Sequence, residues 1–210
     1  MKTLIAIPSM DQVPAQFAQS LATLNKPGDC IITFQIGSLI YASRNELAKK
    51  AVQMGADFIF WLDSDMLFDP NTLTDMMQTL QEQKLDILTG LYFRRVPPFS
   101  PVLFDKLDIK ASETEWHNME TVPDKLFEVE GCGFGCVLMR TEILLSIMAK
   151  NNNLFAPIGN VGEDLSFCWR ARNTGYKIYC DPRVTLGHVG HTIITKEFYE
   201  NYQMAKEAMQ

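Results

Sequence analysis

Residues 58–65 read FIFWLDSD, five apolar residues followed at once by a short stretch with two carboxylates. An unbroken apolar run of this length is typical of a strand that is buried on both faces in a parallel sheet. In open sheets of this kind, ligands bind beyond the carboxyl ends of the strands. The stretch therefore predicts a central strand that delivers Asp63 and Asp65 to a ligand-binding edge.

Strand and helix patterns alternate around this run. Strands are predicted over residues 3–7, 30–34, 58–62 and 85–91. Helices are predicted over residues 14–24, between Ser43 and Gly55, and after Asp69, which is expected to be an N-cap. This order predicts an α/β fold with a mostly parallel central sheet flanked by helices on both faces.

The second half of the chain is less regular. A proline-broken connection is expected over residues 94–101 and a polar, turn-rich segment over 107–123. Further predicted elements are a glycine-containing strand over 127–139, a short helix capped by Thr141, a helix over 162–173, a strand over 176–180 and a terminal helix over 196–209. Because no internal repeat or linker is visible, residues 1–210 are predicted to form one domain.

The composition excludes several classes of protein. The 210 residues are 47% hydrophobic and 21% charged, which excludes disordered and low-complexity chains. A net charge of −6 argues against a nucleic-acid-binding groove, and no apolar run reaches the roughly 18 residues that span a bilayer. The N-terminal apolar stretch is too short for a signal peptide and is predicted to be a strand. Five scattered cysteines without a CxxC pair favour reduced, buried thiols and a cytoplasmic protein.

Asp63 and Asp65 repel each other unless a cation or a shared proton relieves them. A divalent metal that bridges to a diphosphate would do so, since hard cations take oxygen ligands from both sides. His188 and His191, two of the three histidines, could add a neutral imidazole, which suits a Mn²⁺ site that already holds a carboxylate. The alternatives are that the carboxylates only end a strand or form an Asx turn, and that the histidines are ordinary surface or core residues.

Charged residues near predicted helix starts are further candidates. Glu163 and Asp164 are either first-turn acids favoured by the helix dipole or, for Asp164, a general base for an acceptor hydroxyl. Arg44 opens the second predicted helix, where a cation and a helix N-terminus could both bind a diphosphate. Arg94 and Arg95 follow a predicted strand end. For all three arginines, the alternative is a solvated side chain.

The glycine-rich stretch GCGFG at 131–135 is followed by an apolar, strand-like run rather than by a helix. This context argues against a dinucleotide-binding fingerprint. Glycine here is expected to let the backbone approach a ligand or pack tightly in the sheet.

Several short motifs occur in a defined order along the chain. They are SRN at 43–45, WLDSDM at 61–66, the glycine-rich stretch at 131–135, GEDLSFCWRA at 162–171, DP at 181–182 and GHV at 187–189. Together they resemble family-2-like glycosyltransferases of the GT-A fold, in an unusually short form such as phages or bacteria encode. The resemblance runs from the first strand to about Gly190.

The resemblance implies a single GT-A (Rossmann-like) domain, with a nucleotide-binding half over about residues 1–92. The other half, about residues 93–210, would serve the donor sugar and the acceptor and include the terminal helix. The resemblance further implies a UDP-sugar donor, with a UDP-glucose-like hexose favoured, and a hydroxyl acceptor on a carbohydrate or another molecule. No nucleic-acid partner and no transmembrane segment are expected.

The resemblance also assigns roles to residues. Asp65 and His188 would ligate Mn²⁺ or Mg²⁺, with Asp63 and His191 as further candidates, and Asp164 would be the base of an inverting displacement. Asp63 would contact ribose or a metal-bound water, and Arg44 would approach the diphosphate. The residues expected to contact the donor are Pro8, Arg44, Asp63, Ser64, Gly133 and Glu163.

Three alternatives stay open at this point. The stretch 162–189 also resembles retaining transferases, so inversion and retention are both possible outcomes. A non-catalytic module that binds nucleotide sugars would keep the same metal ligands but show no turnover. A phosphohydrolase could use Asp63 as nucleophile and Asp65 as acid, although Met66 stands where such enzymes carry a small β-branched residue.

Overall fold

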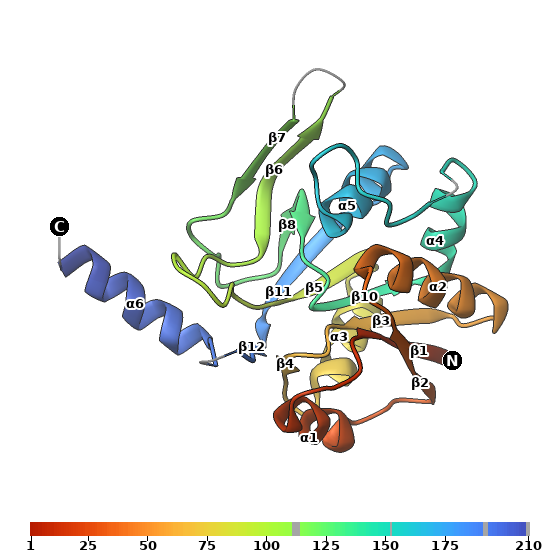
Figure 1. The fold of residues 1–210 in the computed structure, drawn as a ribbon, viewed down its shortest axis with the longest axis horizontal. Coiled ribbons are helices and arrows are strands. Elements are labelled where there is room, and N and C mark those ends of the chain that lie inside the picture. The colour runs from red at the N-terminus through yellow and green to blue at the C-terminus, as the bar shows by residue number, and fades with distance from the viewer. Residues whose placement is uncertain (111–113, 152, 191–192, 209–210) are drawn as a thin grey trace.

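A computed structural model of the chain describes residues 1–110, 114–151, 153–190 and 193–208 (Figure 1). Its central sheet has seven strands in the order β2–β1–β3–β10–β5–β11–β8. In that order they span Asp29–Ile36, Lys2–Ser9, Phe58–Leu62, Cys136–Arg140, Ile87–Leu91, Ile178–Thr185 and Phe127–Val129. Within this sheet β10 and β8 run antiparallel to their neighbours and the other strands pair in parallel. The predicted α/β fold with a mostly parallel sheet is confirmed.

Helices cover both faces of the sheet (Figure 1). One face carries α2 (Ile40–Gln53), α4 (Thr141–Met148) and α5 (Glu163–Asn173), and the other carries α1 (Ala15–Thr23) and α3 (Thr72–Glu82). Successive residues of a strand point to opposite faces. Leu4 and Ala6 of β1 accordingly belong to the core under α2. Ile5 and Ile7 belong to the core that includes Phe17 of α1.

The segment around residues 103–118 forms a hairpin that the sequence analysis did not predict. β6 (Leu103–Ile109) pairs with β7 (Thr114–Asn118), and β9 (Gly131–Cys132) pairs with the other edge of β6. The expectation of a polar, turn-rich segment was wrong here because charged residues interrupt the apolar pattern of β6. Leu107 and Ile109 are nevertheless buried, while Lys106 is exposed.

The strand predicted over residues 127–139 is in fact divided among β8, β9 and β10. The division falls at the glycine-rich stretch, where Gly133 and Gly135 pack against Tyr92. The chain changes direction there, so β8 lies at the sheet edge beside β11 while β10 inserts between β3 and β5. Tight packing, one of the two roles expected for these glycines, is therefore observed.

A two-stranded sheet joins the end of β3 to the segment after β11. β4 (Met66–Leu67) pairs antiparallel with β12 (Gly187–His188). The backbone N–H of Val189 also donates to the carbonyl oxygen of Asp65 at 2.7 Å. Segments from the two halves of the chain are thus held side by side next to the central strand.

Neither residue predicted to be a helix N-cap occupies that position, although Asp69 does accept a backbone hydrogen bond at the start of its helix. The N-cap of α3 is Asn71, and Asp69 instead accepts a hydrogen bond from the Asn71 N–H at 2.8 Å, as in an Asx turn. Thr141 is the first residue of α4, and its N-cap is Arg140, the last residue of β10. Arg140 has an extended backbone because it still belongs to the strand.

The terminal helix α6 (Lys196–Ala208) extends away from the sheet (Figure 1). Aromatic contacts join it to the irregular segment after β5. Tyr199 stacks on Phe93 with ring centroids 4.4 Å apart, and Phe198 and Tyr202 contact Phe99 edge to face. None of its described residues is fully buried.

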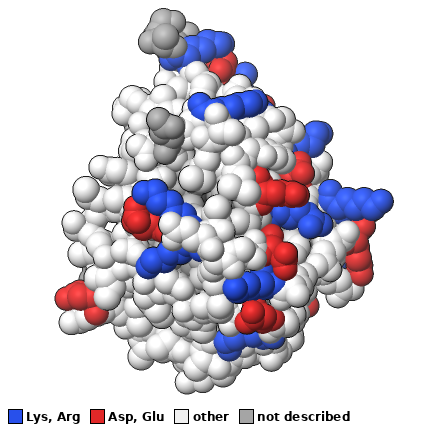
Figure 2. All heavy atoms as spheres, turned by 90° about the vertical axis from the view of Figure 1, so that its right-hand side faces the viewer, with Lys and Arg blue, Asp and Glu red and all other residues white. Residues whose placement is uncertain are grey.

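The surface and the cysteines agree with the composition. On the face shown in Figure 2, the described Lys and Arg side chains lie among Asp and Glu side chains. All five cysteines are free thiols, and four of them are buried. No helix in the described ranges combines the length and the apolarity needed to cross a membrane.

Phe60 and Phe34 offer a matched test of which strand is central. Phe60 in β3 is fully buried, whereas Phe34 in the edge strand β2 is 40% exposed. Phe60→Ala should lower the free energy of unfolding by about 3–5 kcal/mol, because it removes a buried ring and leaves a cavity. Phe34→Ala should cost less than about 1 kcal/mol. Urea unfolding measures both, and equal losses would contradict the placement of β3 inside the sheet and of β2 at its edge.

Candidate active site

Most of the predicted site residues meet in one cavity of about 370 Å³, called here the first cavity. The predicted residues that line it are Pro8, Arg44, Asp63, Ser64, Asp65, Glu163, Asp164 and His188. A second cavity of about 480 Å³ shares Asp63, Asp164 and His188 with the first. Phe104 and Trp116 of the β6–β7 hairpin line the second cavity as well. The two cavities therefore meet at the same group of acidic and imidazole side chains.

Asp65 and His188 are brought together by the pairing of β4 with β12. His188 Nε2 lies 3.5 Å from Asp65 Oδ2, and His188 Nδ1 lies 2.9 Å from the carbonyl oxygen of Phe93. A carbonyl oxygen only accepts hydrogen bonds, so Nδ1 carries the hydrogen, and in the neutral imidazole Nε2 presents a lone pair. A lone pair and a carboxylate oxygen at this distance form a donor pair for a cation.

This pair fits a divalent metal ion that is bound jointly by protein and ligand. An oxygen and an imidazole nitrogen suit Mn²⁺, and a backbone carbonyl on the far ring nitrogen is a common orienting contact of metal-binding histidines. In the part of the chain that the structure describes, no group of three or more His, Cys, Asp or Glu side chains could hold a metal ion. Phosphate and water would have to supply the other ligands, as is usual for Mg²⁺ at nucleotide sites.

Arg95 also contacts the carboxylate of Asp65. Its Nη1 lies 2.9 Å from Asp65 Oδ2 and donates to the carbonyl oxygen of Val189 at 3.3 Å. Burial raises the pKa of Asp65, but the imidazolium form of His188, through its hydrogen bond and its charge, and the charge of Arg95 together lower it below its ordinary value. Arg94 bonds to the hairpin instead. Of the two neighbouring arginines, Arg95 is therefore the one that meets the predicted metal ligand.

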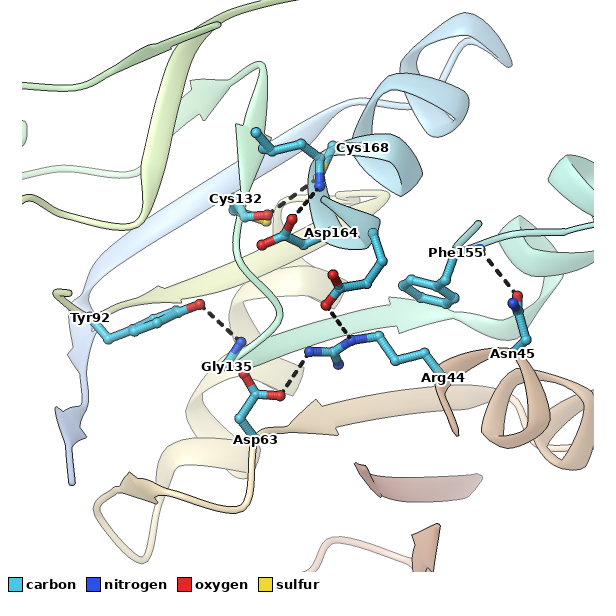
Figure 3. A network of polar contacts seen from close by, with 11 residues as sticks. Arg44, Asn45, Asp63, Tyr92, Cys132, Gly135, Phe155, Asp164 and Cys168 are labelled. Atoms are coloured by element: carbon cyan, nitrogen blue, oxygen red, sulfur yellow. Dashed lines mark hydrogen bonds and ion pairs between the residues drawn. The ribbon is translucent and has the colours of Figure 1, made fainter. Parts of the chain in front are cut away.

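Arg44 lies in the second turn of α2, which begins at Ile40 rather than after Ser43 as predicted. Its Nη2 is 2.8 Å from Asp63 Oδ1, and its Nε is 3.5 Å from Glu163 Oε1 (Figure 3). Burial lowers the pKa of Arg44, but the two carboxylates raise it by more. Because only 3% of the side chain is exposed, a solvated arginine is excluded. Arg44 is a buried counter-ion for the two carboxylates.

Aromatic rings complete the surroundings of the Arg44 guanidinium. Its carbon lies 5.2 Å from the centroid of Phe134 and 5.9 Å from those of Trp61 and Phe155. Its Nη1 has no hydrogen-bond partner within the described residues. The ring faces partly compensate for this missing partner through cation–π attraction.

A helix N-terminus faces the first cavity, but it lies before Arg44, which lines the cavity from the second turn of α2. Gly37, Ser38 and Ile40, at the start of α2, line the cavity. Asn45 lies deeper in the helix, and its Oδ1 accepts a hydrogen bond from the Phe155 N–H at 3.1 Å (Figure 3). The N-terminus of this helix therefore lies about one turn before the predicted position.

Asp164, the second residue of α5, lines both cavities. Burial, with the neighbouring charges of Glu163 and Asp63, raises the pKa of Asp164 to about 6. The Leu165 N–H, which donates to Asp164 Oδ1 at 2.7 Å, and the charge of Arg44 act in the opposite direction. At neutral pH the group is a carboxylate that is more basic than an ordinary aspartate.

Tyr92 lines both cavities, and the sequence analysis missed it. Its hydroxyl oxygen accepts a hydrogen bond from the Gly135 N–H at 3.1 Å (Figure 3), and its ring meets His188 edge to face. Burial raises the pKa of Tyr92 well above its usual value, so the hydroxyl keeps its proton. The glycines at 131–135 were a signal of close packing, but they did not reveal the partner.

One predicted site residue, Gly133, is not found on the cavity walls. Gly133 lies beneath Tyr92, where an added Cβ would be 2.1 Å from the hydroxyl oxygen, and Phe134 lines the first cavity instead. The lack of a side chain at Gly133 thus allows close packing against Tyr92. His191 falls outside the described residues.

Comparison with known proteins gives one family and two similar structures. The family model described as Glycosyltransferase like family 2 matches residues 29–206. The crystal structure of A197 from STIV has 18% sequence identity and a TM-score of 0.69, and the match covers 94% of this chain and 91% of that chain. The crystal structure of GalNAc-T7 with UDP, GalNAc and Mn²⁺ has 7% identity and a TM-score of 0.61, with 90% and 44% covered. No curated protein matches the chain.

At these identities the two structures are evidence of a shared fold alone. This chain corresponds to less than half of the GalNAc-T7 chain, so that protein's ligands are not transferred by the comparison. The sheet order and the similar structures agree with the predicted minimal GT-A fold. Because the family model matches most of the sequence, from the edge strand β2 into α6, the chain belongs to the glycosyltransferase like family 2.

Proposed function

We propose that this protein is a metal-dependent glycosyltransferase. It would transfer a hexose, with UDP-glucose or a close relative as the favoured donor, to the hydroxyl of a carbohydrate or another acceptor. One observation carries the proposal: the Asp65 carboxylate and the Nε2 lone pair of His188 converge in the same cavity as the basic carboxylate of Asp164. The whole chain would act as one domain, with nucleotide contacts mainly from residues 1–92 and sugar and acceptor contacts mainly from residues 93–210.

Asp65 and His188 are the proposed ligands of Mn²⁺ or Mg²⁺. When bound there, the ion would neutralise the negative charge that develops on the departing nucleotide diphosphate. Phe93 would orient His188 through its carbonyl oxygen. Asp63 is paired with Arg44, which favours a contact with ribose or with a metal-bound water over direct ligation.

The first cavity is the proposed donor site. Pro8 and Ser64 line it beside the start of α2, where the positive end of the helix dipole favours a phosphate. Arg44 is already paired with Asp63 and Glu163, so we assign it to holding these carboxylates in position rather than to direct contact with the diphosphate. Glu163 remains a candidate for donor contact because it lines the same cavity.

Asp164 is the proposed general base. The proton of the acceptor hydroxyl would pass to an Asp164 carboxylate oxygen while the acceptor oxygen bonds to the anomeric carbon. The bond between that carbon and the phosphate oxygen would break, and its electrons would leave with the nucleotide diphosphate. This displacement inverts the configuration at the anomeric carbon. A base with a pKa near 6 is deprotonated at neutral pH and still has useful basicity.

The second cavity is the proposed entry for the acceptor. It reaches Asp164 and is lined by Phe104 and by Trp116, whose side chain is exposed although large and apolar. A flat indole with an exposed face is a suitable surface for the apolar face of a sugar ring. The same cavity could equally take another hydroxyl compound that has an apolar body.

A mutation of each proposed metal ligand tests the metal requirement. Asp65→Ala and His188→Ala should each reduce donor turnover by about a hundredfold or more, because charge stabilisation by a metal is worth several kcal/mol. Asp105→Ala and His117→Ala are matched controls, since these two residues form an exposed Asp–His pair 2.8 Å apart on the hairpin. Turnover is read as released nucleotide with Mn²⁺ present, and circular dichroism checks the fold. Full activity in excess chelator would refute the metal, and an inactive His191→Ala beside a normal His188→Ala would refute the choice of histidine.

The donor preference is tested by thermal shift. With Mn²⁺, UDP at a hundred times its dissociation constant should stabilise the protein by about 2.7 kcal/mol. For a chain of this size, that corresponds to a rise of roughly 5–10 °C in Tm. GDP and CMP should give smaller shifts at equal concentration, and UDP-glucose should be hydrolysed slowly without acceptor. Stabilisation by GDP alone would overturn the UDP assignment.

Asp164→Asn tests the proposed base and separates a catalyst from a binding module. The amide keeps the shape but cannot take a proton, so transfer should fall by about 10²–10⁴-fold while affinity for UDP and Mn²⁺ stays near normal. In the unsubstituted protein, kcat/KM should rise with pH up to about 6 and then level off, because the base must be deprotonated. Near-normal transfer by the variant would refute the inverting base and favour a retaining mechanism. A chain that binds UDP and Mn²⁺ but never turns over would be a binding module.

A further inference from the structure

Asp65 Oδ2 contacts both Arg95 and His188, and a bound metal ion would change both contacts. Arg95 Nη1 lies 2.9 Å from this oxygen, and His188 Nε2 lies 3.5 Å from it. The guanidinium is the permanent positive charge of the two, because the imidazole is charged only when it is protonated. A divalent ion held by Asp65 and His188 would take the same oxygen and would repel the guanidinium at this distance.

Arg95 can change partner at small cost. Its side chain is 48% exposed, and it stands in the irregular segment 94–101, where most residues are exposed. An ion pair with this much exposure contributes little free energy, so its loss is easily offset. Its second contact, with the carbonyl oxygen of Val189, is long at 3.3 Å.

The charge of the first cavity gives Arg95 a second partner. Four carboxylates line this cavity, those of Asp63, Asp65, Glu163 and Asp164, and they repel a diphosphate. Arg44 is the other arginine on the wall, but it is buried and already paired with two of the carboxylates. Arg95 lines both cavities and is the accessible guanidinium, the group best suited to bind phosphate oxygens through two parallel hydrogen bonds.

We propose that Arg95 exchanges partners during donor binding. In the ligand-free protein it is the counter-ion of Asp65, and when metal and nucleotide bind, it moves to the diphosphate. The inference rests on the proposed function and adds a device to it. Free metal alone must displace Arg95 without compensation, whereas metal with a diphosphate gives the guanidinium a new partner. The exchange therefore makes metal and nucleotide strengthen each other's binding beyond their direct contact.

The test compares Arg95→Met with Arg94→Met in the full chain. The two substitutions remove the same charge from adjacent exposed positions, but Arg94 bonds to Asn118 rather than to Asp65. Binding of Mn²⁺ is followed by the loss of the free-ion electron paramagnetic resonance signal, without and with UDP. UDP affinity at saturating Mn²⁺ is measured by calorimetry.

Arg95→Met should bind Mn²⁺ alone about three- to fivefold more tightly than the unsubstituted protein, since the competing cation is gone. Its affinity for UDP at saturating Mn²⁺ should fall about tenfold, since a charged phosphate contact is lost. Arg94→Met should change neither value by more than about twofold.

The proposed exchange is overturned if Arg95→Met does not bind Mn²⁺ more tightly, or if it does not bind UDP more weakly at saturating Mn²⁺. It is also overturned if Arg94→Met reproduces both changes, because the effect would then be a general effect of charge. These results leave the proposed function intact as long as UDP promotes Mn²⁺ binding to the unsubstituted protein. If neither the two variants nor the unsubstituted protein binds Mn²⁺ in the presence of UDP, the metal site is refuted, and the proposed metal-dependent function is refuted as well.

Discussion

The buried guanidinium of Arg44 is the constraint on which the site depends. A charge that is only 3% exposed must be neutralised, and Asp63 at the end of β3 and Glu163 at the start of α5 do so. Breaking a buried pair of this kind typically costs about 3–5 kcal/mol. The requirement therefore pulls the central strand, α2 and α5 toward one point (Figure 3). Asp65 and Asp164, each one or two residues from these anchors, are carried to the same cavity.

The excess of carboxylates in the first cavity affects both the pKa of Asp164 and the binding of an anionic ligand. Burial, and after it the nearby negative charge, raises the pKa of Asp164, which makes this carboxylate more basic. The same negative field repels a diphosphate, so an anionic donor would need positive charge beside it. Among the described residues that line the first cavity, the arginines are Arg44 and Arg95. For the proposed nucleotide-sugar donor, a metal ion held by Asp65 and His188 and the exposed guanidinium of Arg95 would supply this positive charge.

The short β4–β12 pairing gives the cavity its precision. Two backbone strands of two residues each align His188 with Met66, directly after Asp65. The Phe93 carbonyl then selects the tautomer that leaves Nε2 free. Main-chain contacts of this kind depend little on side-chain type, which is consistent with a fold that is shared at low sequence identity.

Much of this architecture could be predicted from local sequence. The run at 58–62 and the strands and helices around it were predicted because their apolar periodicity needs no partner to be recognised. The GEDLSFCWRA motif likewise marked the start of α5. The β6–β7 hairpin was not predictable, because its buried Leu107 and Ile109 lie among charged residues and gain meaning only when β9 pairs beside them. The sequence also did not reveal which distant residues contact one another. It did not show that Arg44 is buried or that Asp65 contacts Arg95 rather than Arg94. It also did not show that Tyr92 fills the space over Gly133. Residue types and local periodicity are properties of the chain, whereas burial and pairing between distant segments exist only once the sheet has brought them together.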